Sequence, residues 1–205
     1  LTFSYVSKAN EFYPGDVTIE VAYTLTDENE LNIKYKATTT EDTLLNLTNH
    51  AYFNLDGISG NTLDQKLQIN AEKFLELDDE NIPTGNFIPM ENHAFDFRSS
   101  KNVVAGIDHC FVLKNNTEPA AILESVKNGV TMKVYTDQPA VQIYVGGKTS
   151  DELQNKESVE YHTESGICFE TQVFPDAPNH EDFPNAILRK GETYQQNTTF
   201  QFIIS

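Results

Sequence analysis

Residues 46–55 read Asn-Leu-Thr-Asn-His-Ala-Tyr-Phe-Asn-Leu, and they alternate in character as the side chains of a β-strand alternate between two faces. The apolar face would carry Leu45, Leu47, Ala51, Phe53 and Leu55, and the polar face Asn46, Thr48, His50, Tyr52 and Asn54. A solvent-facing strand normally carries Lys, Glu or Arg, whereas this polar face holds only uncharged hydrogen-bonding groups, one phenol ring and one histidine. That composition suits a cleft for a neutral polar ligand; an ordinary exposed strand is the alternative.

Strand patterns continue on both sides of this stretch. Residues 17–25 and 31–37 carry apolar side chains at odd positions on either side of a turn, as expected for a hairpin with one buried face. Further strands are expected at 2–6, 67–71, 74–77, 103–113, 121–126, 130–135, 140–145, 167–174 and 199–204, with a loop through Pro83, Gly85 and Pro89. No helix-period apolar stripe runs over a dozen residues. The sequence therefore predicts an all-β fold, a sandwich or an open barrel, with residues 1–205 as a single domain.

The composition limits the classes of partner. The chain has 31 acidic and 14 basic residues, and its formal net charge of -17 at pH 7 repels nucleic acid and anionic membranes. No apolar run approaches the roughly 20 residues that span a bilayer. The two cysteines, Cys110 and Cys168, are too few for a secreted fold built on disulfides. We therefore expect a soluble, cytoplasmic protein that binds neither nucleic acid nor membranes.

Glu170 is the first candidate for chemistry. It lies in a largely apolar strand, and Cys168, Gln172 and Phe174 share its face. Because burial disfavours the ionised form of a carboxyl group, Glu170 should be paired or have a raised pKa. The alternative is an edge strand on which Glu170 points into water.

Asp108 and His109 are the second candidates. Adjacent residues on a strand point to opposite faces, so one would serve a site and the other would be structural. The histidines show no metal-ligand spacing, at His50, His93, His109, His162 and His180, and no Cys-x-x-Cys pair occurs. A serine-hydrolase elbow, a phosphate-cradling loop and a dinucleotide fingerprint are absent from the sequence. A histidine and carboxylates in a neutral polar cleft indicate proton transfer, without a metal or a cofactor.

Three motifs in the same order give the chain a resemblance to a known family. Residues 48–55 (Thr-Asn-His-Ala-Tyr-Phe-Asn-Leu), 106–111 (Gly-Ile-Asp-His-Cys-Phe) and 169–179 (Phe-Glu-Thr-Gln-Val-Phe-Pro-Asp-Ala-Pro-Asn) together resemble the aldose 1-epimerase (galactose mutarotase) family. The resemblance implies a large antiparallel β-sandwich with a sugar cleft on one sheet. It implies an enzyme that interconverts the α and β anomers of free hexoses such as galactose and glucose.

The resemblance also implies roles for particular residues. Glu170 matches the general base that acts on the C1 hydroxyl, and His50 matches the general acid that acts on the ring oxygen. Sugar-binding residues would be Asp108, Gln142, Asn49 and Tyr52. Both cysteines are expected to be reduced and non-catalytic.

One feature of the family has no counterpart in this sequence. The family has a segment before the loop at Tyr13-Pro14-Gly15 that supplies the first strands, an arginine and another histidine. The resemblance thus implies the C-terminal portion of a longer epimerase domain, which needs that segment or self-association to cover the apolar row of residues 17–25. Two other classes stay open: a non-catalytic carbohydrate-binding module, and a glycosidase that uses Asp108 and Glu170 as its two carboxylates.

Overall fold

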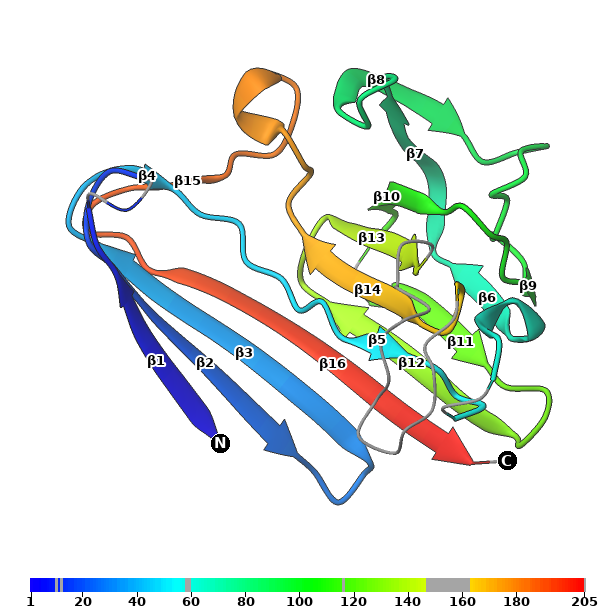
Figure 1. Cartoon of the computed structure of the whole chain (residues 1–205). Helices are drawn as coiled ribbons and strands as arrows, with labels where there is room; N and C mark the ends of the chain where they lie inside the picture. The colour runs from blue at the N-terminus through cyan, green and yellow to red at the C-terminus, as the bar shows by residue number, and fades with distance from the viewer. Residues whose placement is uncertain (10, 12, 58–59, 116, 147–162, 205) are drawn as a thin grey trace.

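Two antiparallel β-sheets make up most of the computed structural model, which describes residues 1–9, 11, 13–57, 60–115, 117–146 and 163–204 (Figure 1). In spatial order, the larger sheet contains β1 (Thr2–Ser7), β2 (Val17–Leu25), β3 (Glu30–Thr39), β16 (Tyr194–Ile204), β12 (Val130–Thr136), β11 (Ala121–Glu124), β6 (Lys66–Ile69) and β9 (Lys101–Asn102). The smaller sheet contains β5 (Tyr52–Phe53), β14 (Ile167–Gln172), β13 (Ala140–Val145), β10 (Asp108–Leu113), β7 (Ala71–Leu77) and β8 (Pro83–Pro89). The predicted all-β sandwich is confirmed.

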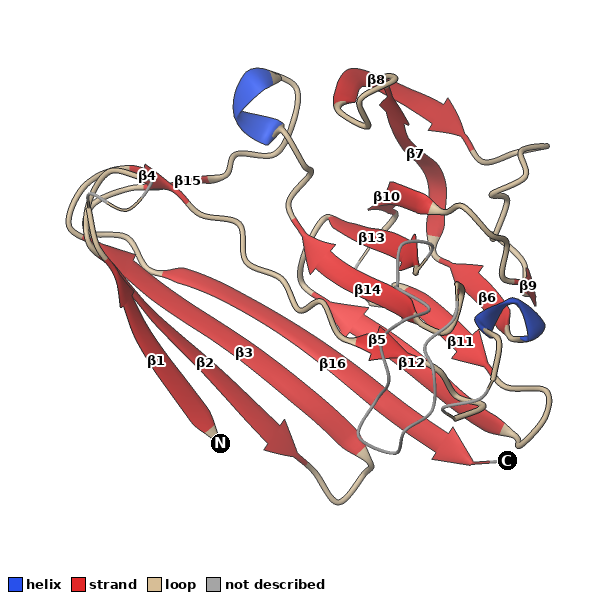
Figure 2. Ribbon diagram, in the orientation of Figure 1, coloured by secondary structure: helices blue, strands red, loops and turns tan. Residues whose placement is uncertain are grey.

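The remaining regular structure is short. Strands β4 (Thr43–Leu44) and β15 (Ile187–Leu188) pair with each other, and two single-turn 3-10 helices, η1 (Thr62–Asp64) and η2 (Ala177–Asn179), interrupt the loops (Figure 2). The segment that carries η2 packs Phe174, Ala177 and Phe183 against Cys110 of β10. This small second core covers part of the outer face of the smaller sheet.

The main core lies between the two sheets. Phe169 of β14 and Phe200 of β16 are fully buried, and the ring of Phe53 packs against both of them. Ile143 of β13 and Ile167 of β14 belong to the same buried cluster. Because neighbouring residues of a strand point to opposite faces, the even-numbered residues of β13 and β14 point away from this core. Those residues form the floor of the site described below.

The hairpin predicted from the odd-numbered apolar row is confirmed. β2 pairs with β3 along its whole length, from Val17 opposite Thr39 to Leu25 opposite Leu31. The strands expected near 2–6, 67–71, 74–77, 103–113, 121–126, 130–135, 140–145, 167–174 and 199–204 are also present, with ends that differ by up to several residues.

Residues 46–55 do not form one continuous strand, so that part of the prediction is wrong. Only Tyr52–Phe53 pairs with β14. The amide of Asn46 instead makes two hydrogen bonds with the backbone of Val173, at 2.9 and 3.0 Å, and the Thr48 hydroxyl donates to the carbonyl of Thr171 at 3.1 Å. These polar side chains occupy backbone groups that a strand ladder would use, and such local bonding competes with sheet formation.

The two-faced interpretation of that stretch holds in part. Leu47, Phe53 and Leu55 pack against the main core as predicted, whereas Ala51 is exposed. The strict alternation therefore fails where the backbone leaves the extended pairing geometry, but the division into a core side and a polar side survives around it.

The prediction of a loop through Pro83, Gly85 and Pro89 is also wrong, because these residues form β8. β8 is the outermost strand of the smaller sheet in the described part of the chain, and its two prolines stand at its ends. Proline is tolerated at such edge positions because no ladder partner needs its missing N–H. Gly85 has φ +91°, which any other residue adopts with difficulty.

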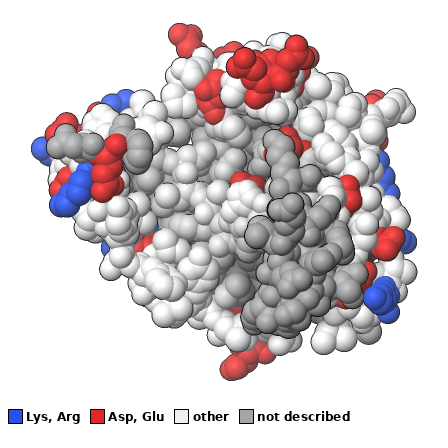
Figure 3. All heavy atoms as spheres, viewed as in Figure 1, with Lys and Arg blue, Asp and Glu red and all other residues white. Residues whose placement is uncertain are grey.

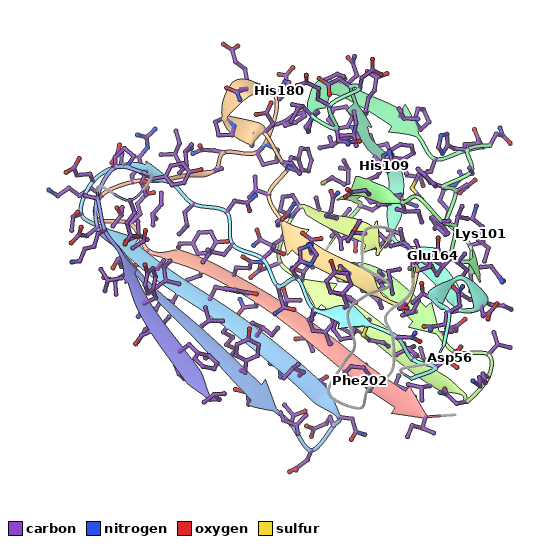
Figure 4. The ribbon with its side chains drawn as sticks, in the orientation of Figure 1. Asp56, Lys101, His109, Glu164, His180 and Phe202 are labelled. Atoms are coloured by element: carbon purple, nitrogen blue, oxygen red, sulfur yellow. The ribbon has the colours of Figure 1, made fainter. Side chains whose placement is uncertain are left out.

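Gly85→Ala should destabilise the fold strongly. A Cβ at Gly85 would lie 2.8 Å from Nδ1 of His180, whose Nε2 lies 3.1 Å from the carbonyl oxygen of Pro83 (Figure 4 labels His180). We expect the free energy of unfolding, measured by urea denaturation, to fall by about 1–2 kcal/mol because of the left-handed backbone. Overpacking against His180 should lower it by roughly 1–3 kcal/mol more.

Gly191→Ala is the matched control, because Gly191 has φ +90° but no neighbouring atom within 4 Å of the added carbon. The free energy of unfolding of this variant should fall only by the backbone contribution of about 1–2 kcal/mol. Equal losses in the two variants would contradict the contact with His180.

The surface of the chain is acidic. Asp and Glu side chains gather at the top of the view in Figure 3, over the turn between β7 and β8, where Asp78, Asp79 and Glu80 follow one another. Such a surface repels polyanions. Among the described residues, no helix has the length and the apolar character required to cross a bilayer.

Candidate active site

A cleft of about 470 Å³ opens on the outer face of the smaller sheet. It is lined by His50, Tyr52, Asp108, Gln142, Tyr144, Glu170, Gln172 and Pro175. The lining contains two carboxylates and one imidazole among neutral polar groups. Five of the six residues expected from the sequence therefore come together, although they derive from four separate segments of the chain.

Strand pairing explains how these residues meet. One transverse row of the sheet runs through Asp108, Tyr144, Cys168 and Tyr52, and the next row runs through Cys110, Gln142 and Glu170. Residues two apart on a strand share a face, so both rows lie on the same side of the sheet. The pairing register thus places the carboxylates of β10 and β14 on either side of β13.

His50 and Glu170 lie in contact within the cleft. The imidazole Nε2 of His50 lies 3.4 Å from the carboxylate Oε1 of Glu170, and the two side chains are 51% and 12% exposed. Burial raises the pKa of Glu170 above the ordinary 4.5, the nearby His50 opposes that rise, and the charge of Asp108 adds to it. The prediction that Glu170 is paired or has a raised pKa is confirmed on both counts.

The other ring nitrogen of His50 faces a thiol. Sγ of Cys168 lies 3.4 Å from Nδ1, and the rings of Tyr52 and Tyr144 lie 5.2 and 6.0 Å from the imidazole. Burial raises the pKa of the Cys168 thiol, and the charges of Glu170 and Asp108 raise it further. His50 is therefore held between a neutral thiol and a carboxylate. Both cysteines of the chain are unpaired and buried. That they are reduced and non-catalytic stays a prediction.

Asp108 and His109 divide their roles as the alternation predicted. Nε2 of Gln142 donates a 2.7 Å hydrogen bond to Oδ1 of Asp108, which orients that carboxylate in the cleft. His109 packs on the other side, with its ring 5.3 Å from Phe74 and 4.8 Å from Phe95 (Figure 4). Burial lowers the pKa of His109 and so favours its neutral form, while the charge of Asp108 opposes that shift.

Gln142 presents one further group. Its amide oxygen is buried and has no hydrogen-bond partner among the described residues. A buried acceptor without a donor is costly, and a ligand hydroxyl that reaches it would remove that cost.

Asn49 is the one expected site residue that does not line the cleft. Its side-chain NH2 donates to the hydroxyl of Tyr23 at 3.3 Å, and its side-chain oxygen accepts from the backbone N–H of Ala51 at 3.1 Å. These bonds fix the backbone on both sides of His50. The structure thus places Asn49 in the loop that carries the imidazole and not in the lining of the cleft.

Three lining residues were not among the expected site residues. The period of two had already placed Gln172 on the face of Glu170, and Tyr144 lies two positions beyond Gln142, so the same period could have identified both. Pro175 follows the end of β14, where no periodicity applies. His162, one of the five histidines considered for a metal site, lies outside the described residues.

Comparison with known proteins places the chain in a family. The family model for aldose 1-epimerase matches residues 1–201. The chain belongs to the aldose 1-epimerase family. Galactose mutarotase from Mus musculus is 40% identical over 206 residues, which cover 95% of this chain and 60% of that protein. Aldose 1-epimerase from Escherichia coli strain K12 is 35% identical over 208 residues, which cover 93% of this chain and 60% of that protein.

Solved structures of the epimerase family share this fold. An aldose epimerase homologue from C. elegans superimposes with a TM-score of 0.90 at 31% identity, over 99% of this chain and 65% of that one. Galactose 1-epimerase from Lactobacillus acidophilus superimposes with a TM-score of 0.85 at 28% identity, over 100% of this chain and 62% of that one. The chain therefore spans about 60% of the length of the curated relatives it matches.

Proposed function

We propose that the chain supplies the proton-transfer and sugar-binding residues of an aldose 1-epimerase that interconverts the α and β anomers of free hexoses such as galactose and glucose. The 3.4 Å separation of His50 Nε2 and Glu170 Oε1 carries this proposal. The anomeric hydroxyl and the ring oxygen are bonded to the same carbon. A base acting on one and an acid acting on the other must therefore lie within a few ångströms of each other.

The proposed reaction needs only these two groups to move protons. The Glu170 carboxylate takes the proton of the C1 hydroxyl while protonated His50 gives a proton to the ring oxygen, and the bond between C1 and that oxygen breaks. The open aldehyde rotates about its C1–C2 bond. His50 then takes the proton back from the freed hydroxyl as its oxygen attacks C1, and Glu170 returns its proton to the carbonyl oxygen, which gives the other anomer.

The remaining residues would hold the sugar. Asp108 accepts hydrogen bonds from sugar hydroxyls, and the Gln142 amide oxygen accepts another. The Tyr52 and Tyr144 rings beside His50 offer faces for the apolar C–H groups of a hexose and hydroxyls for its polar edge. Asn49 contributes through the position of the His50 loop.

Polarimetry on freshly dissolved α-galactose, together with an assay of disaccharide hydrolysis, tests the proposal. We expect the natural full-length protein to accelerate anomer exchange and to release no monosaccharide from a disaccharide. Binding without acceleration would indicate a carbohydrate-binding module instead, and hydrolysis would indicate a glycosidase.

The acid limb of the pH profile should lie above pH 4.5. Glu170 must be ionised to act as a base, and burial raises its pKa, so kcat/KM should rise with pH through a midpoint above the ordinary carboxyl value of 4.5. Asp108→Asn removes a negative charge that raises this pKa, so the midpoint should move to lower pH even though sugar binding weakens. Asp64→Asn, which removes a charge outside the cleft lining, should leave the midpoint unchanged. If Asp108→Asn leaves the midpoint unchanged, the Asp108 charge does not raise the pKa of Glu170.

We also propose a cytoplasmic location for this activity. Both cysteines are free and buried, which suits a reducing compartment.

A further inference from the structure

Three different metal-ligating side chains converge at the cleft floor. An imidazole nitrogen of His50, the sulfur of Cys168 and a carboxylate oxygen of Glu170 all lie within 4.8 Å of one another. Ligand atoms around a tetrahedral zinc ion stand about 3.3–3.8 Å apart, given bond lengths of roughly 2.0–2.3 Å. Spacing along the sequence gave no sign of this set, because His50 comes from a separate segment.

The geometry allows the contraction that a metal would require. Cys168 and Glu170 lie two residues apart on β14 and so share one face of a rigid strand. Cys168 and Glu170 contact different ring nitrogens of His50, Nδ1 and Nε2, each at 3.4 Å, so the ring must turn to offer one nitrogen to a shared ion. His50 lies outside the strands and its side chain is half exposed, which leaves room for that turn.

The donor set selects a class of cation. One nitrogen, one thiolate and one carboxylate suit zinc and similar borderline ions, whereas magnesium prefers oxygen ligands alone. The carboxylate of Asp108, which also lines the cleft, adds a favourable charge for any cation.

We propose that His50, Cys168 and Glu170 form a zinc-class site whose occupation switches off the cleft. When the metal ion binds, the Cys168 thiol releases its proton to the buffer, and the resulting thiolate becomes a metal ligand. The same ion takes the His50 lone pair and a Glu170 oxygen, so neither group can transfer a proton. The inhibitory consequence rests on the proposed epimerase function, whereas the binding itself does not.

Cobalt(II) is the probe for binding, because a cobalt ion bound to a thiolate gives a charge-transfer absorption band in the near ultraviolet. Titration of the protein should produce this band, and zinc added afterwards should abolish it by displacing cobalt. Cys168→Ala should lose the band, while Cys110→Ala should keep it, since Cys110 is the other buried thiol but does not belong to the cluster. His50→Asn should weaken cobalt binding at least tenfold.

Several results would overturn the inference. They are the absence of the band in the parent protein, its retention in Cys168→Ala, and its equal loss in Cys110→Ala. Circular dichroism checks that each variant is folded, and Cys168→Ser, which keeps the size of the side chain, replaces Cys168→Ala if the latter does not fold.

Polarimetry then separates this inference from the proposed function. Zinc should inhibit anomer exchange competitively with galactose in the parent protein and in Cys110→Ala, whereas magnesium at the same concentration should not. Rates are compared with those of each variant without metal. A cobalt band in a protein with no epimerase activity would remove the proposed function and leave the metal site, and an active enzyme without the band would do the reverse. Binding without inhibition would overturn the switching role.

Discussion

Glu170→Gln should lower the rate of anomer exchange at least 10²-fold, the usual effect of a lost general base, in the natural full-length protein. The amide keeps the shape of the side chain but cannot accept the proton of the C1 hydroxyl. His50→Asn should have an effect of similar size, because the ring oxygen then lacks a proton donor within reach. Polarimetry measures both rates, and calorimetric titration with galactose should show that binding largely survives.

The matched control changes the same chemical group away from the cleft. Glu164 precedes β14 and is not among the lining residues, so Glu164→Gln should retain the parent rate within a few fold (Figure 4 labels Glu164). Near-normal turnover in Glu170→Gln or His50→Asn would remove the role assigned to that residue. A parallel loss in Glu164→Gln would point to a general effect of charge on the protein instead.

Local periodicity was sufficient where backbone pairing decides the structure. In the β2–β3 hairpin the odd-numbered residues of β2 from Ile19 to Leu25 stand opposite the odd-numbered residues of β3 from Ala37 to Leu31, and the period of two reports that directly. The same reasoning separated Asp108 from His109, because alternation along β10 does not depend on its neighbours. It also placed Gln172 on the face of Glu170, and it would have reached Tyr144 had it been followed two residues beyond Gln142.

Periodicity failed where side chains replace backbone pairing. The side chains of Asn46 and Thr48 bond to the backbone at the C-terminal end of β14, and residues 46–51 stay out of the sheet although their alternation is that of a strand. The contact between Cys168 and His50 could not be predicted either, since it depends on how that irregular segment approaches β14. The proline-flanked β8 was missed because its edge position, which tolerates both prolines, is a property of the whole sheet.

The 205-residue chain on its own should self-associate through β1 and the sheet face beside it. β1 is the outermost strand of the larger sheet and leaves one row of backbone groups without a strand partner in the described part of the chain (Figure 1). Phe3 and Tyr5 pair with Val21 and Ile19 of β2 and are 56% and 59% exposed. Exposed apolar edge strands recruit other chains. Covering the exposed half of each ring contributes about 2–3 kcal/mol, given roughly 25 cal/mol per Å².

Size-exclusion chromatography with light scattering measures this association. The chain should elute as a dimer or a larger species, and it should show little mutarotase activity by polarimetry. Phe3→Lys and Tyr5→Lys place a charge in the apolar patch and should shift the chain towards monomer. Ser4→Lys adds the same charge to the same strand on its opposite face, so it should leave the association largely intact. A parent chain that stays monomeric and fully active would show that this face needs no cover and that the cleft is complete without one.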